Sequence, residues 1–190
     1  MKTRWLICIG AAAIPLGAAH GQSVRIEALA GSDTDGIDHG ALLGARIGYD
    51  FMAAPNVTIG IDGEFNDIAT EQRFIGSPIV IDYGPELYVG GRATFTVPAI
   101  SNRLRVFAGA GYSRSRFGNF FLLNPPPPPN GPLGPIGAET RSVGGFRLTA
   151  GAQFSLGSRA FLGGEYRYSD YGDRFAPDRG QLVGSIGFRF

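Results

Sequence analysis

Cysteine and lysine are almost absent from this 190-residue chain. The only cysteine, Cys8, and the only lysine, Lys2, lie close to the N-terminus, so the rest of the chain has no thiol and no ammonium side chain. A disulfide framework and a thiolate metal site are therefore excluded there. An exported domain without crosslinks needs another source of stability, and a closed β-sheet can supply it.

Clustered charge and long apolar runs are also missing. The chain has 17 basic and 16 acidic residues, and the arginines are spread among the acids. This excludes the cationic face that a nucleic-acid-binding domain needs. After residue 21, no stretch reaches the roughly 18 consecutive apolar residues of a membrane-spanning helix, which excludes a helical membrane protein. A β-barrel stays open, because its strands need only about 9–11 residues with apolar side chains at alternate positions.

The first twenty-one residues have the layout of a secretory signal peptide. Lys2 and Arg4 give a positive start, Trp5–Ala19 are apolar or small, and Ala19-His20-Gly21 offers a cleavage site after Ala19 or after Gly21. The alternative is a membrane helix, but this apolar stretch falls short of the roughly 20 residues that such a helix needs. We predict a signal peptide over residues 1–21 and one exported domain over residues 22–190.

Apolar and polar residues alternate with a period of two in eight segments of the exported domain. In the last segment, Leu182, Ile186 and Phe188 share one face, while Arg189 lies on the other. The other segments place their charges in the same way. The eight segments are Val24–Ala30, Ala41–Phe51, Val57–Asn66, Pro85–Val97, Leu104–Ser113, Val143–Phe154, Ala160–Ser169 and Gln181–Phe190.

The polar faces of these segments carry seven arginines and six carboxylates. They are Arg25, Glu27, Arg46, Asp50, Asp62, Glu64, Glu86, Arg92, Arg105, Arg147, Glu165, Arg167 and Arg189. A nearly balanced set suits the interior of a narrow barrel, because a charge removed from water must be paired. Arginine also suits forked bonding to carboxylates in a confined space. We predict a structural network of these charges inside the barrel.

Short and long connections alternate between the segments. Met52–Asn56, Pro98–Arg103 and Gly157–Ser158 are short. The other four are longer: Gly31–His39, Asp67–Asp82, Arg116–Arg141 and Asp170–Arg179. Outer-membrane barrels have short periplasmic turns and longer extracellular loops. The sequence therefore predicts an all-β fold, an eight-stranded antiparallel up-and-down transmembrane β-barrel with both termini in the periplasm, preceded by a cleaved signal peptide.

Aromatic residues on the apolar faces gather near the strand ends. Those near the periplasmic ends are Tyr49, Phe51, Phe95, Phe154, Phe188 and Phe190; those near the outer ends are Phe65, Tyr112, Tyr166 and Tyr168. The alternative is a soluble barrel with aromatic residues in its core. Segregation to two ends instead favours two girdles at the membrane interfaces.

The last two segments are similar to a known family. The stretch Gly164-Glu165-Tyr166-Arg167-Tyr168-Ser169-Asp170-Tyr171-Gly172 resembles the penultimate strand of opacity-type surface antigens, which are small outer-membrane barrels. The ending Ile186-Gly187-Phe188-Arg189-Phe190 fits the same family. The resemblance implies that Phe188 and Phe190 form the signal by which the barrel-assembly machinery recognises the chain. It implies a family and leaves the activity open.

No set of residues suggests catalysis or a cofactor. His39 is the only histidine clear of the signal region, and the loop predicted around it has no serine suited to a hydrolase site. Asp33, Asp35 and Asp38 could supply oxygen ligands to calcium, but their spacing differs from that of a helix-loop-helix site, and turns around Gly36 explain them equally well. We predict that the protein is not an enzyme and has no metal or cofactor site.

The longer loops are the candidate working surface. Pro125–Pro129, followed by Pro132 and Pro135, predicts a stiff polyproline segment that is either a recognition element or a spacer. Arg114 and Arg116 follow the fifth segment on its outward face, where lipopolysaccharide phosphates would lie. We expect a monomer in outer-membrane lipid with a structural or surface-binding role. The alternatives are a small-solute, porin-like channel and a lipid-modifying enzyme.

Overall fold

The computed structural model describes residues 21–34, 39–69, 71–73, 79–121, 137–172 and 178–190. These residues form antiparallel strands. None of them forms a helix with the length and hydropathy needed to span a bilayer. The strands are β1 (Gln22–Thr34), β2 (His39–Ala54), β3 (Val57–Ala69), β4 (Glu71–Arg73), β5 (Ile79–Val97), β6 (Ser101–Phe121), β7 (Gly137–Ser155), β8 (Ala160–Asp170) and β9 (Arg179–Arg189).

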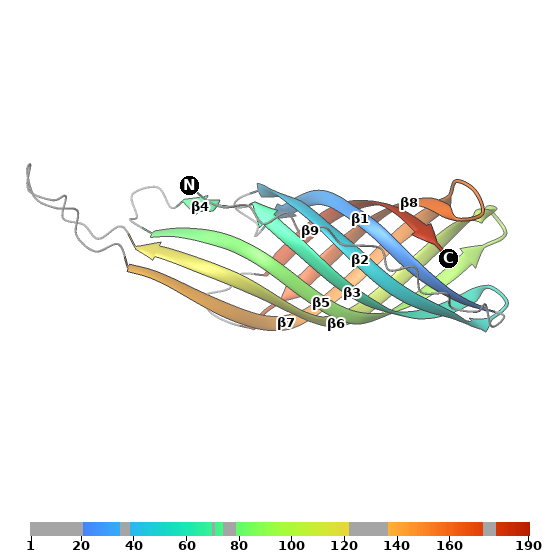
Figure 1. The fold of residues 1–190 in the computed structure, drawn as a ribbon, viewed down its shortest axis with the longest axis horizontal. Helices are drawn as coiled ribbons and strands as arrows, with labels where there is room; N and C mark the ends of the chain where they lie inside the picture. The colour runs from blue at the N-terminus through green and yellow to red at the C-terminus, as the bar shows by residue number, and fades with distance from the viewer. Residues whose placement is uncertain (1–20, 35–38, 70, 74–78, 122–136, 173–177) are drawn as a thin grey trace, which may run out of the picture.

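Eight of these strands close into a barrel. They pair in the order β3-β2-β1-β9-β8-β7-β6-β5, and β3 pairs with β5 to complete the ring. Each of these eight strands pairs with the barrel strand that follows it in the chain. The first strand, β1, also pairs with the last, β9, and this pairing closes the ring (Figure 1). The predicted eight-stranded antiparallel up-and-down barrel is confirmed. Residues 1–20, which hold the expected signal peptide, lie outside the described residues, and β1 begins at Gln22.

The two faces of the wall differ in the opposite sense to those of a soluble protein. Ile61 is 61% exposed, whereas the next residue, Asp62, is 3% exposed. Leu182 is 65% exposed on the outside, and its neighbour Val183 is buried inside. Successive residues of a strand point to opposite faces of the wall. The apolar residues therefore meet the lipid, and the charged residues fill the interior.

The two ends of the barrel differ in the reach of their strands. At one end, here called the turn end, residues 55–56, 98–100 and 156–159 make the connections, and the C-terminus lies there (Figure 1). At the other, the loop end, β5, β6 and β7 extend furthest, and β6 and β7 stay paired as far as Phe121 and Gly137. The short β4 pairs with β5 in this extension.

Several residues expected in loops belong to strands. The predicted loops Gly31–His39, Asp67–Asp82, Arg116–Arg141 and Asp170–Arg179 all overlap the strands at both ends, because β1 runs to Thr34, β3 to Ala69, β6 to Phe121 and β8 to Asp170, and the following strands begin at His39, Ile79, Gly137 and Arg179. Asp33 and Arg179 therefore lie in the barrel wall rather than in loops. The alternation in the sequence marks only the membrane-spanning part of each strand. Hydrogen bonding between neighbouring strands continues beyond that part.

The interior also holds an apolar cluster, on the loop-end side of most of the charges. Its buried members are Leu29, Leu42, Ile68, Val143, Tyr171 and Val183. These side chains come from five of the strands and from Tyr171, which directly follows β8. The barrel interior is therefore packed with side chains of both kinds, as expected for eight strands.

Candidate functional site

The charged interior begins, at the turn-end side, with Arg25. Arg25 and Glu27 lie two residues apart on β1, so both side chains point inward. The Arg25 guanidinium donates to both oxygens of Asp50, at 2.7 and 3.0 Å, to Asp62 at 2.7 Å and to Glu27 at 2.5 Å. One buried cation thus neutralises carboxylates from three strands, which a forked guanidinium can do and an ammonium cannot do as well.

The next layer is built around Arg46 on β2. Its guanidinium lies 2.7 Å from a Glu64 oxygen and 3.4 Å from Glu27, and it pairs with Glu165 on the opposite wall. Arg92 on β5 lies 2.9 Å from Asp62 and 3.5 Å from Glu27. Glu27 therefore joins the Arg25 layer to the Arg46 layer.

Glu64 carries the network further toward the loop end. It accepts hydrogen bonds from Arg147 at 2.9 Å and Arg167 at 2.7 Å, and Arg167 also pairs with Glu165. Arg147 pairs in turn with Glu86, which accepts a hydrogen bond from the Tyr171 hydroxyl at 3.1 Å. Every charge named in this layer is buried.

Asp33 and Arg179 extend the network at the loop end, where the sequence interpretation had placed loops. Arg179 pairs with Asp33 and lies 3.7 Å from Glu86, and Gln181 donates to Asp33 at 3.0 Å. A sequence signal for both residues existed. Asp33 continues the inward alternation of Arg25 and Glu27, and Arg179 precedes Gln181 by two residues.

Linked ion pairs thus run from one end of the interior to the other. The path passes through Arg189, Asp50, Arg25, Glu27, Arg46, Glu64, Arg147, Glu86, Arg179 and Asp33. Inward aromatic rings pack against three of the arginines: Arg92 over Phe107, Arg147 over Tyr88 and Arg189 over Phe161, at 4.3, 5.0 and 5.2 Å from the ring centres. These charges fill the lumen with bonded side chains.

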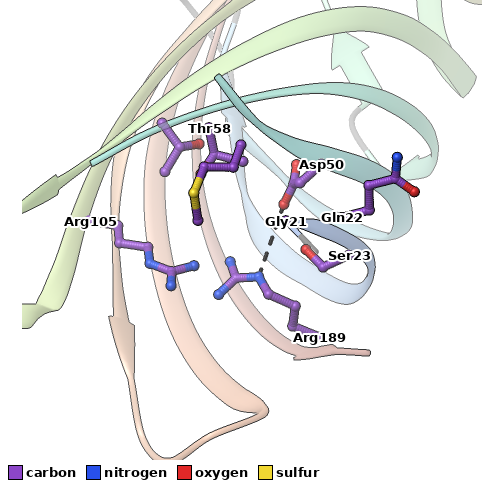
Figure 2. A pocket seen from close by; sticks show the side chains of 9 residues that line it. Gly21, Gln22, Ser23, Asp50, Thr58, Arg105 and Arg189 are labelled. Carbon is purple, nitrogen blue, oxygen red and sulfur yellow. Dashed lines mark ion pairs between the residues drawn. The ribbon is translucent and has the colours of Figure 1, made fainter. Parts of the chain in front are cut away.

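The turn end of the interior is different, because its charges are incompletely paired. Arg189 lies 4.0 Å from Asp50, and Arg105 has no ion pair among the described residues. Figure 2 shows their guanidinium groups facing each other across a pocket that also receives the Asp50 carboxylate. Of the thirteen charges assigned to the interior from the sequence, Arg105 is the one without an ionic partner in the described structure.

The predicted surface residues lie on the outer wall. Arg114 and Arg116 are exposed on β6. They lie two and four residues after the outward-facing Tyr112 and therefore on the same face of the strand. Phe188 and Phe190 are 52% and 66% exposed at the turn end. The aromatic residues assigned to the two girdles face outward as well. The proline segment of residues 125–135 lies outside the described residues.

The structure gives Asp33 a role different from both a calcium ligand and a turn residue. This side chain is buried in the barrel, and its oxygens bond to Arg179 and Gln181. Asp35 and Asp38 lie outside the described residues. Among the residues that are described, no group of three or more His, Cys, Asp and Glu side chains could hold a metal. His39 begins β2 as an exposed residue, paired through its backbone with Thr34.

Comparison with known proteins identifies the family. The model of the outer membrane protein β-barrel domain matches residues 6–190, nearly the whole chain. The chain belongs to this family. It is therefore an outer-membrane β-barrel of a Gram-negative bacterium, as the sequence predicted. No curated protein matches the chain in sequence.

Solved structures share the barrel fold at low sequence identity. Ail, the attachment invasion locus protein of Yersinia pestis, is 19% identical, with 90% of this chain and 99% of that chain covered and a TM-score of 0.57. Neisserial surface protein A is 14% identical, with coverage of 92% and 100% and a TM-score of 0.55. The N-terminal barrel domain of Pseudomonas aeruginosa OprF is 15% identical, with coverage of 90% and 100% and a TM-score of 0.51.

Proposed function

We propose that this protein is a closed outer-membrane barrel that acts as a surface-binding protein through its extracellular end. It does not act as an open channel or as an enzyme. The observation that carries this proposal is the path of buried ion pairs that leads from Asp50 to Asp33, with Arg189 at its turn end 4.0 Å from Asp50. A solute crossing the lumen would have to break these buried pairs, and each unpaired charge left behind is strongly unfavourable.

The size of the barrel supports the same conclusion. Eight strands enclose a space that side chains alone can fill. Here the buried interior side chains include Arg147 and Arg167, each at most 1% exposed. The apolar cluster around Leu29 and Val183 adds a second layer that excludes water. A porin-like role would need an open path through the barrel, and the described interior contains none.

The loop end supports a binding role. We assign this end to the outside of the cell, because outer-membrane barrels have their longer loops there. There β5, β6 and β7 continue as a paired sheet beyond the ends of β8 and β9, with β6 paired to β7 through Phe121 and Gly137 (Figure 1). A hydrogen-bonded projection of this kind can present side chains to a ligand without opening the barrel. Ail, which shares the fold, has been crystallised with the heparin analogue sucrose octasulfate.

Lipopolysaccharide is the partner we propose for the outer wall. Arg114 and Arg116 are exposed on the lipid-facing side of β6, and neither has an ion-pair partner among the described residues. Their spacing of two residues places both on one face, about 7 Å apart along the strand. Two such cations beyond the aromatic belt residue Tyr112 can pair with phosphate groups of lipopolysaccharide by charge-assisted hydrogen bonds. We expect the protein to do this as a monomer.

The described residues offer no catalytic arrangement for the lipid-modifying alternative. His39 is exposed, and its side chain makes no hydrogen bond within the described part of the chain. A hydrolase would need a hydroxyl nucleophile and an orienting acid within hydrogen-bond reach of the histidine. Comparing the mass spectra of lipid A from cells with and without the protein tests this directly, and we expect identical spectra.

Conductance in planar bilayers tests the closed barrel. Insertion is first established by heat-modifiable migration of the protein on gels, so that a silent recording reports a closed barrel rather than a failed reconstitution. We expect no stable open steps across the physiological voltage range. Reproducible single-channel steps of constant size from the inserted protein would contradict the proposal.

A further inference from the structure

The positive charge of the lumen is concentrated at the turn end. Among the described residues, the buried interior charges comprise six arginines and seven carboxylates. The two remaining interior arginines, Arg105 and Arg189, are only partly buried and lie at the opening of the barrel (Figure 2). The deep interior is therefore close to neutral, and the surplus of cations lies where solvent enters.

Of these two arginines, Arg105 is the one whose guanidinium group has a buried nitrogen without a hydrogen-bond partner. Its Nε is buried and has no hydrogen-bond partner, and the side chain has no ion pair among the described residues. A buried donor without a partner is unfavourable by itself. Here the donor belongs to a cation that faces a second cation, so the arrangement favours an added anion.

Arg189 is only weakly neutralised by the protein. Its Nε lies 4.0 Å from Asp50. Both oxygens of that carboxylate already accept hydrogen bonds from Arg25, at 2.7 and 3.0 Å. Among the described residues that line the pocket, Asp50 is the only one with a carboxylate, and this carboxylate is bound more closely by Arg25 than by Arg189. Packing against the Phe161 ring, 5.2 Å away, holds the Arg189 guanidinium in place.

The two arginines line an open pocket of about 200 Å³. Its lining residues are Gly21, Gln22, Ser23, Asp50, Met52, Thr58, Thr94, Arg105 and Arg189. Ser23, Thr58 and Thr94 add hydroxyl donors around the cations. We propose that this pocket binds a phosphoryl group, with Arg105 and Arg189 as its charge-assisted donors. Forked guanidinium groups match the tetrahedral oxygens of phosphate better than a point charge does.

The group can come from two sources. Loop length places the turn end in the periplasm, where a free phosphate or phosphate ester could enter the opening. The rim of the pocket, at Gln22 and Met52, is formed by residues that stay in the mature chain, and it lies at the turn end, close to where headgroups of the inner leaflet would be. Both sources present the same chemistry to Arg105 and Arg189.

Titration with inorganic phosphate tests the site. The mature protein, without its signal peptide, is folded in a maltoside detergent, which carries no phosphate. The ionic strength is held constant with chloride. Arginine Nε–H resonances are followed by NMR. We expect saturable shifts of the Arg105 and Arg189 signals. R105Q should bind phosphate about tenfold more weakly, because it removes one charge-assisted donor. R103Q, which removes an exposed arginine on the same strand, should bind like the wild type.

Two results would overturn the site. One is the absence of saturable shifts in the wild-type protein. The other is an equal loss of affinity in R103Q and R105Q, which would mean that phosphate only screens surface charge. Because Arg105 has no ionic partner among the described residues, R105Q should fold normally, and heat-modifiable migration verifies this.

A lipid arm identifies the source of the phosphoryl group. The titration is repeated in nanodiscs of phosphatidylglycerol. If the Arg105 and Arg189 signals start at their bound positions and added phosphate moves them no further, the headgroup occupies the site. If the titration matches that in detergent, the ligand is a free phosphate. Either result in nanodiscs supports the site when the detergent titration is saturable.

Discussion

Arg25 and Asp50 form a bidentate ion pair inside the barrel, with Nε to Oδ2 at 2.7 Å and the terminal nitrogen to Oδ1 at 3.0 Å. The two residues come from adjacent strands, β1 and β2, but they are not directly opposite in the sheet, where Arg25 faces Gly48 and Asp50 faces Ser23. Gly48 leaves the space that the guanidinium occupies, because a Cβ there would meet the Arg25 and Asp62 side chains. The pair is therefore diagonal, and the missing side chain makes room for it.

Replacing Arg25 tests the cost of breaking this layer. R25Q leaves Asp50, Asp62 and Glu27 without their shared buried cation, and we expect a loss of about 3–5 kcal/mol in the free energy of unfolding. Urea unfolding followed by gel mobility measures it. R103Q, which removes an exposed arginine, is the control and should change stability little. If the R25Q variant is as stable as R103Q, these carboxylates do not depend on Arg25, and hydration by water is enough to stabilise them.

The pair between Arg179 and Asp33 links β9 to β1 near the loop end. A double-mutant cycle with D33N, R179Q and the double variant isolates their coupling. We expect each single change to destabilise the barrel and the double change to cost less than the sum. A coupling of about 0.5–3 kcal/mol is typical of contacting residues in one network. Additive effects would place the two side chains in independent environments.

Close packing inside the wall is tested at Gly151 on β7. A Cβ added there would lie 2.7 Å from the Phe107 ring and 2.7 Å from the Cβ of Glu165, closer than real atoms approach. We expect G151A to destabilise the barrel by about 1–3 kcal/mol. At Gly164, on the neighbouring strand, a Cβ would meet nothing within 4 Å. G164A should therefore unfold at nearly the wild-type urea concentration, and equal effects of the two variants would contradict the packing.

The lipopolysaccharide contact is tested by removing both outward cations of β6. R114Q/R116Q should fold normally, because neither residue has an ion-pair partner among the described residues. We expect less lipopolysaccharide to co-purify with this variant, since two charge-assisted contacts to phosphate are lost. R103Q/R159Q, which removes two exposed arginines at the turn end, is the matched control. Unchanged co-purification would count against the contact.

The C-terminal aromatic residue is proposed as an assembly signal. Phe190 is 66% exposed, so its ring contributes little to packing within the barrel. We expect F190A to lower the amount of folded protein in the outer membrane of cells and to leave refolding in detergent unchanged. F154A removes another outward aromatic residue near the turn end and controls for the loss of an interfacial ring. Equal losses in the two variants would assign Phe190 to the girdle alone.

The sequence predicted the wall of the barrel residue by residue. Alternation between Phe188 and Arg189, or Ile61 and Asp62, assigns the two faces without any knowledge of the fold, because successive residues of a strand always point to opposite sides. The alternation is strong here because lipid outside and a narrow interior impose opposite demands. The same pattern was less useful where strands leave the membrane, since the lipid demand ends there and hydrogen bonding alone sustains the strand. Asp33 and Arg179 were missed for this reason.

The sequence by itself thus determined the fold class, the number of barrel strands and, within the membrane-spanning segments, which charges face inward, because these follow from local alternation and from the balance of charges. Only the tertiary structure decided which charges meet. Arg46 pairs with Glu165, 119 residues away, and Arg179 pairs with Asp33, 146 residues away. Partners across a lumen depend on the register and tilt of all the strands and on the reach of each side chain, which no local pattern records. The same geometry leaves Arg105 without an ionic partner in the described interior and makes the turn end the candidate anion site.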